Sequence, residues 1–298
     1  MIAKTIRTCF PIAVAAVADK AEEINKLNVF PVPDGDTGTN MSLTLQSVVK
    51  ELAALPVDAD MGGIAGAITH GSLMGARGNS GVITSQILRG VAEGLREAGE
   101  PISSADIASA FRRAVKVAFQ AVRKPIEGTI LTVLRDVSTK ADECEKRRMS
   151  VEETLDALVV EAYQSVARTP DLLPVLMENG VVDSGAFGFA IFLENFVAAA
   201  LHEHERHHAR RRARQHRRQR QPPRPAPART QARLRHRRDE QGRRRCGERH
   251  QAHPDRRLPA QRRAPAHEHP LRAHRHLCRL PFTGVHVLSG GHHAPFTP

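Results

Sequence analysis

Two aspartates stand two residues apart in a turn rich in glycine and proline near the N-terminus. Asp34 and Asp36 bracket Gly35 within the segment LNVFPVPDGDTGTNM, which spans residues 27–41. Two carboxylates on an irregular turn can point into one site, and such hard oxygen ligands suit Mg²⁺, which takes phosphate oxygens and water besides a few carboxylates. The simpler alternative is a turn followed by a helix N-cap. The spaced ligands and closing glutamate of an EF-hand calcium loop are missing.

The residues that follow these aspartates open a predicted helix and suit a phosphate group. Thr37, Thr39 and Asn40 stand at the helix start, where backbone amides favour anions. Gly38, between the two threonines, lets the backbone come close to a ligand. The first segment therefore predicts a site for a metal ion and a phosphate side by side.

A second glycine-rich segment, GSLMGARGNSG at residues 71–81, lies between two predicted helices. Gly78, Asn79 and Ser80 combine a flexible backbone with amide and hydroxyl donors, which is typical of a loop that holds a nucleotide phosphate. No Lys–Ser/Thr pair follows the glycines, so this is not a Walker A loop. The alternative is that the glycines only allow two helices to pack closely.

Two further segments also begin helices. Gly128 and Thr129 lie in EGTILTV at residues 127–133, and GVVDSGAFG at residues 180–188 contains Asp183, Ser184 and Gly185. Asp183 taken alone is a candidate N-cap. Because all four segments stand at predicted helix starts, an antiparallel bundle could bring them to one end, around one anionic ligand.

The elements that must position these residues are helices. Apolar residues recur at steps of three and four as far as about residue 200, and strand-like alternation is scarce. Ser103 and Ser150 precede acidic residues in the manner of N-caps. The pattern predicts an all-α domain with helices near residues 8–27, 40–54, 60–75, 80–98, 104–123, 129–147, 151–168 and 184–200.

The last 98 residues differ in kind from the first 200. They contain 25 of the 44 Lys and Arg residues, every one an arginine, 15 of the 16 histidines and eleven prolines, but only nine Leu, Ile and Val residues. Residues 201–298 thus carry a net charge of +18, and residues 1–200 carry −6. A segment so poor in apolar residues cannot offset the entropy lost on ordering, so we expect it to be disordered.

Two interpretations of this segment remain open. A basic tail could bind nucleic acid through its phosphates. Alternatively, the chain is read out of frame after about residue 201, because arginine, histidine and proline without lysine are what a GC-rich gene yields in a wrong frame. The four cysteines are far apart and form neither a CxxC pair nor a disulfide framework. No uncharged apolar run approaches the length of a membrane span, and we expect a cytoplasmic protein.

The four segments, in this order and spacing, resemble the DhaL (Dak2) domain, the ATP-binding domain of dihydroxyacetone kinases and bacterial fatty acid kinases. The resemblance covers about residues 5–200. The form VFPVPDGDTGTNM is more similar to the fatty acid kinase catalytic subunit than to the sugar kinase subunit. The resemblance implies an eight-helix antiparallel barrel with ATP at one end and two Mg²⁺ ions held by clustered carboxylates.

Carried over by motif position, the resemblance implies that Asp34 and Asp36 are metal ligands. Asn28 is a third ligand, where the sugar kinase form has an aspartate. It also implies that two groups of residues contact the nucleotide. The first group faces the phosphates and the second lines or closes over the nucleotide: Thr37, Gly38, Thr39 and Asn40; then Gly78, Asn79, Ser80, Gly128, Thr129, Asp183, Ser184 and Gly185.

The resemblance further implies a partner, because fatty acid kinases act on a fatty acid presented by a separate binding protein. In that family the kinase domain is followed by a middle and a C-terminal domain, and residues 201–298 match neither, which puts docking of the carrier in doubt. A homodimer is left open, and nucleic acid is expected only as a non-specific partner of the basic tail. A dihydroxyacetone kinase nucleotide subunit and a nucleotide-binding protein without turnover are the alternatives.

Overall fold

The computed structural model describes the backbone of residues 2–220 and the side chains of residues 2–206. This part of the chain is all-α and contains no strand. Eight helices are long, and two, α2 and α9, have six residues each. The helices are α1 (Ile2–Asp19), α2 (Ala21–Lys26), α3 (Thr37–Ala54), α4 (Met61–Gly75), α5 (Gly78–Leu95), α6 (Ser104–Ala121), α7 (Ile130–Lys146), α8 (Val151–Leu172), α9 (Pro174–Asn179) and α10 (Ser184–Arg220).

Long helices that follow one another in the chain pack side by side and antiparallel. On α5 and α6, Gly90 faces Ala114 while Gly94 faces Ala110, so the two helices run in opposite directions. A Cβ atom on either glycine would lie about 2.5 Å from a backbone atom of α6, which is closer than real Cβ contacts. Glycine therefore allows these two helices to approach closely.

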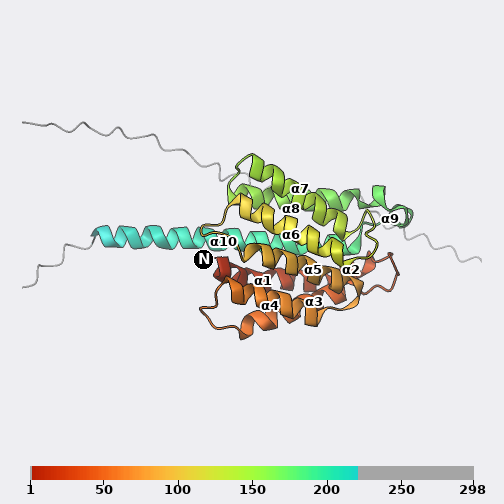
Figure 1. Cartoon of the computed structure of the whole chain (residues 1–298), viewed down its shortest axis with the longest axis horizontal. Helices are drawn as coiled ribbons and strands as arrows, with labels where there is room; N and C mark the ends of the chain where they lie inside the picture. The colour runs from red at the N-terminus through yellow and green to blue at the C-terminus, as the bar shows by residue number, and fades with distance from the viewer. Residues whose placement is uncertain (1, 221–298) are drawn as a thin grey trace, which may run out of the picture. The chain divides into compact units, whose positions relative to one another are not determined.

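The hydrophobic core has two clusters, one formed mainly by α1, α3 and α4 and the other mainly by α6, α7 and α8. Helix α10 lies between these two groups of helices and contributes buried residues to both clusters (Figure 1). On one side the ring of Phe192 meets Phe10 of α1 edge to face, with centroids 5.2 Å apart. On the other side the Tyr163 hydroxyl of α8 donates to Glu194 at 2.6 Å. Because α10 contacts both the first and the eighth helix, it connects the two ends of the helix series.

An apolar pocket of about 290 Å³ reaches into the hydrophobic core and is lined by side chains of α1, α3, α4, α5, α6, α8 and α10. Thr84 of α5 lines this pocket, and its hydroxyl is the one buried side-chain polar atom without a hydrogen-bond partner among the described residues. Unsatisfied buried hydroxyls are costly, so this group is an exception in an otherwise satisfied core.

Several helix boundaries differ from the expected ones, and α1 begins at Ile2 rather than near residue 8. The first predicted helix is divided into α1 and α2 at Lys20, and α9 is an additional short helix. Pro170 lies inside α8, which continues to Leu172 rather than ending near residue 168. Both N-caps are confirmed, since Ser103 with Asp106 and Ser150 with Glu153 form reciprocal capping boxes.

Helix α10 extends to Arg220, beyond the expected end at residue 200. Residues 201–220 contain neither proline nor glycine, so nothing in their sequence stops a helix. The domain boundary at residue 200 stays a prediction. Disorder was expected for residues 201–298, but residues 201–220 are helical, and residues 221–298 lie outside the described residues.

One stretch of the described residues, Ser184–Arg206 of α10, is long and apolar enough to cross a membrane by length and composition alone. No such stretch was expected from the sequence, because Glu194 interrupts the run of uncharged residues. Half of this stretch is buried within the helical bundle, and a helix in a protein core has the same composition.

Candidate functional site

The loop between α2 and α3 carries the paired aspartates. Asn28 is buried at the loop's beginning, and its Nδ2 donates to Oδ1 of Asp34 at 2.6 Å. Gly35 has φ of +64°, a left-handed conformation that glycine adopts without strain. Asp34 is exposed and Asp36 is half-buried. The loop thus presents one carboxylate that an asparagine orients and a second one at the start of α3.

The start of α3 is capped from another helix. Asp36 occupies the N-cap position, yet its side chain accepts no capping hydrogen bond. Instead, Oδ1 of Asn25 in α2 accepts from the backbone amides of Gly38 at 2.8 Å and Thr39 at 3.2 Å. The expectation that these amides are available to a phosphate therefore does not fit the observed geometry, because a protein side chain already uses them.

Sequence reasoning missed Asn25. Its backbone oxygen accepts from the amide of Asn28 at 3.1 Å, so the two asparagines lie on the same turn at the end of α2. Two asparagines three residues apart, directly before a glycine-rich turn, are the signal that could have indicated both roles.

The second loop packs against the first half of α3. Gly78 has φ of +57°, and a Cβ atom there would lie 2.4 Å from Nδ2 of Asn40. The amide of Arg77 donates to Oγ1 of Thr44 at 3.2 Å. Of the predicted contact residues, Asn79 is exposed and Ser80 is half-buried. These contacts place the second glycine segment beside the residues that open α3.

The fourth segment connects the first and the third. The Ser184 hydroxyl donates to Oγ1 of Thr37 at 3.2 Å, a contact between residues 147 positions apart. Oδ2 of Asp183 accepts from the amide of Ile130 at 3.1 Å and from that of Ala186 at 2.8 Å. Burial raises the pKa of Asp183 to about 6, although both amide hydrogen bonds act in the opposite direction. Asp183 therefore holds the starts of α7 and α10 together.

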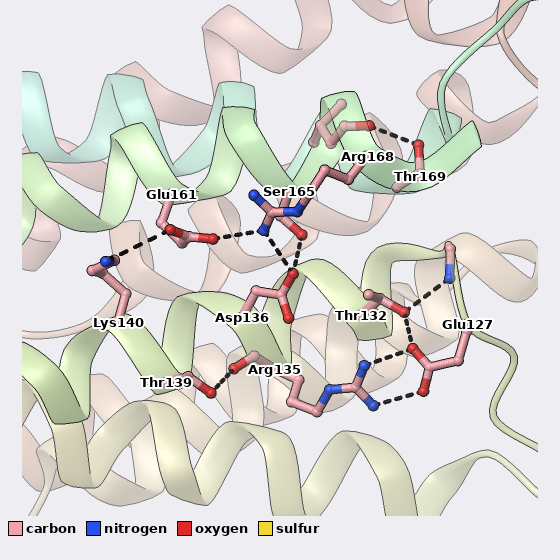
Figure 2. A network of polar contacts seen from close by, with 12 residues as sticks. Glu127, Thr132, Arg135, Asp136, Thr139, Lys140, Glu161, Ser165, Arg168 and Thr169 are labelled. Atoms are coloured by element: carbon pink, nitrogen blue, oxygen red, sulfur yellow. Dashed lines mark hydrogen bonds and ion pairs between the residues drawn. The ribbon is translucent and has the colours of Figure 1, made fainter. Parts of the chain in front are cut away.

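The third segment has an ion pair between Glu127 and Arg135 on its solvent-exposed side (Figure 2). The amide of Gly128, whose φ is +80°, donates to Oγ1 of Thr132 at 3.0 Å, and the Thr132 hydroxyl donates to Glu127 at 2.8 Å. Arg135 binds both oxygens of Glu127 at 2.6 Å and so lowers the pKa of that carboxyl group. Thr129 is half-buried, and its hydroxyl donates to the carbonyl oxygen of Ile126 at 2.8 Å.

The same face of α7 is joined to α8 by a second polar group, seen beside the first in Figure 2. Asp136 accepts from the hydroxyl of Ser165 at 2.6 Å and from Arg168 at 3.0 Å. Arg168 also donates to Glu161 at 2.7 Å, which Lys140 approaches at 3.8 Å. These contacts hold α7 against α8 next to the third loop. None of the residues predicted to bind the nucleotide takes part in them.

The predicted site residues thus fall into two groups. Asp34, Asp36, Thr39, Asn40, Gly78, Asn79, Ser80 and Thr129 are exposed or half-buried at the loop surface. The others are buried, and several of them join one loop to another: Asn28, Thr37, Gly38, Gly128, Asp183, Ser184 and Gly185. The roles assigned to both groups stay predictions, but the loops that carry them do meet at one end of the domain.

The donor set at this end fits a Mg²⁺ ion that arrives with a nucleotide. Asp34 and Asp36 supply carboxylate oxygens, and the amide group of Asn28 touches the first of them. The described residues contain no cluster of three or more His, Cys, Asp or Glu side chains that could hold a metal alone. Mg²⁺ is usually bound by one or two carboxylates together with substrate phosphates and water, so two carboxylates are sufficient.

Known proteins match this chain over most of its helical part. The DAK2 domain matches residues 31–198. Protein YloV of Bacillus subtilis is 45% identical over 183 residues, which are 61% of this chain and 33% of YloV. Uncharacterized proteins of Mycoplasma pneumoniae and Staphylococcus saprophyticus are each 44% identical, over 61% of this chain and 34% and 33% of their own lengths. The chain spans about a third of the length of these curated relatives. The matched region includes the first loop from Pro31 onward and all of the other three, and the chain belongs to the DAK2 (DhaL) domain family.

Proposed function

We propose that this chain is an ATP- and Mg²⁺-dependent phosphotransferase module that transfers the γ-phosphoryl group of ATP to an acceptor oxygen. The observation that carries the proposal is the meeting of four loops. Thr37 contacts Ser184, Asn40 adjoins Gly78, and Asp183 binds the amide of Ile130. Together with membership of a kinase ATP-binding family, this favours a nucleotide at the loop end of an eight-helix antiparallel barrel.

The exposed groups at this end would hold the nucleotide. Asp34 and Asp36 would hold Mg²⁺, which would neutralise phosphate charge. Oγ1 of Thr39 accepts a hydrogen bond from Asn25 at 3.1 Å, so its own proton is available to a phosphate oxygen. Asn40, Asn79 and Ser80 are further donors on the same surface. Buried Asp183 would hold the third and fourth loops together, because it accepts from the amides of Ile130 and Ala186.

Phosphoryl transfer depends mainly on positioning and charge neutralisation. The loop residues therefore need to orient the γ-phosphoryl group in line with the acceptor, and no strongly basic side chain is required. A carboxylate acceptor is already ionised at neutral pH, so its attack needs no general base.

We further propose that the acceptor is a fatty acid carboxylate presented by a carrier protein, and that the product is an acyl phosphate. The support is the form VFPVPDGDTGTNM, which is similar to that of fatty acid kinases. A dihydroxyacetone kinase nucleotide subunit remains the second candidate, because it uses the same loops for a sugar bound elsewhere.

Calorimetric titration with ATP tests the proposal. We expect ATP to bind in the presence of Mg²⁺ and to bind at least about tenfold more weakly in EDTA or in Asp34→Asn, because phosphate charge is then poorly neutralised. Equal affinity in all three conditions would contradict the metal assignment, and no binding by the folded wild-type chain would contradict the proposed function.

A further inference from the structure

The start of α3 is capped by Asn25 of α2 and not by Asp36, the residue at its own N-cap position. An aspartate at an N-cap position ordinarily uses its own carboxylate to accept from the amides of the first turn. Asp36 does not, because its backbone has φ of −117° and ψ of −2° rather than the extended conformation typical of an N-cap. Asn25 of α2 accepts from those amides instead.

The geometry leaves little freedom in this arrangement. A Cβ atom on Gly38 would lie 2.2 Å from the carbonyl oxygen of Ala21, so α2 and the first turn of α3 are in direct backbone contact. Asn25 uses both ends of its amide group, since Nδ2 donates to Oγ1 of Thr39 while Oδ1 accepts from the two amides. An asparagine at this place can therefore satisfy three groups of α3 at once.

We infer that Asn25 is a positioning residue for the metal site: by capping α3 from α2, it leaves the Asp36 carboxylate available to Mg²⁺. This inference rests on the proposed function, because it assigns the ion to Asp34 and Asp36. Asn28, three residues further along the same turn, donates directly to Asp34, so the two asparagines at and just after the end of α2 support both carboxylates. Removing a residue that supports a metal ligand typically lowers metal affinity by about 10–100-fold.

Asn25→Ala tests the inference, with Ser103→Ala as its matched control. Both changes remove a side chain that caps the start of a helix, but Ser103 caps α6, which begins at the opposite end of the bundle from α3. Each should lower the melting temperature in EDTA by about 2–4 °C, because a lost N-cap has a similar effect in most helices. Asp36→Asn should leave the melting temperature within about 1 °C of wild type, since its carboxylate caps nothing.

The decisive measurement is the Mg²⁺ concentration that gives half-maximal ATP binding. Asn25→Ala should raise it by about tenfold, whereas Ser103→Ala should leave it unchanged. A wild-type value in Asn25→Ala would reduce Asn25 to a structural cap and overturn the inference. An Asp36→Asn loss of melting temperature as large as that of Asn25→Ala would overturn it too, whatever the metal does. Failure of the wild-type chain to bind Mg²⁺-ATP would instead remove the proposed function on which it rests.

Discussion

Two aspartates at helix starts are used in opposite ways. Asp36 precedes α3 at the domain surface, and its carboxylate accepts no capping bond. Asp183 precedes α10, is buried, and accepts from amides of two helices. Residue type and position relative to the helix are nearly the same. What separates them is how the protein uses the carboxylate: buried Asp183 accepts from two backbone amides, whereas the half-buried carboxylate of Asp36 caps no helix.

The largest effect is expected from removing the buried carboxylate. Asp183→Ala should lower the free energy of unfolding by about 2–4 kcal/mol, because the amides of Ile130 and Ala186 lose their acceptor inside the protein. Urea denaturation measures this loss. In the matched variant Asp36→Ala the loss should stay below about 0.5 kcal/mol. Similar losses in the two variants would show that the comparison between these aspartates is wrong.

Gly78 and Gly180 allow the effect of backbone strain to be distinguished from the effect of contact with a neighbouring side chain. Gly78 and Gly180 have φ of +57° and +64°, but a Cβ atom meets Asn40 at the first and nothing within 4 Å at the second. Alanine at either position should cost about 1 kcal/mol of stability, because both backbones are left-handed. ATP affinity should fall about tenfold in Gly78→Ala alone, since Asn40 must move away from the new methyl group. Equal affinities, measured by calorimetry, would mean that Asn40 does not contact the nucleotide.

A pH dependence is the third expectation and concerns Asp183 again. Its pKa is about 6 in the folded chain and 3.8 in the unfolded chain, so the folded state binds the proton more tightly. Stability therefore rises as the pH falls from 7 through 6 toward 4, and we expect a gain of about 1 kcal/mol between pH 7 and pH 5. Asp183→Asn should lack this gain. The same pH response in both proteins, followed by urea denaturation, would show that another group is responsible.

The sequence allowed the all-α class and the four loops to be predicted, because helical periodicity and glycine at helix starts are local signals. The N-caps at Ser103 and Ser150 were predicted for the same reason, and the structure shows that both form capping boxes. Asn25 was not predicted, because its partners Gly38 and Thr39 lie in a different helix and only its spacing from Asn28 is a local signal. The buried contact between Ser184 and Thr37 depends on how α10 packs against α3, and no local pattern in either segment encodes it.

The smallest effect is expected at the ion pair outside the third loop. Arg135 and Glu127 are about half exposed, so water and salt weaken their attraction, although the pair binds through two hydrogen bonds. Arg135→Gln should lower the free energy of unfolding by about 0.5 kcal/mol and leave ATP affinity within about threefold. Gly128 keeps its position in this variant, because its amide donates to Thr132 and its backbone packs against Leu173 and Thr169. A tenfold loss of ATP affinity, measured by calorimetry on the folded variant, would mean that the exposed pair and not the buried Asp183 holds this loop in place.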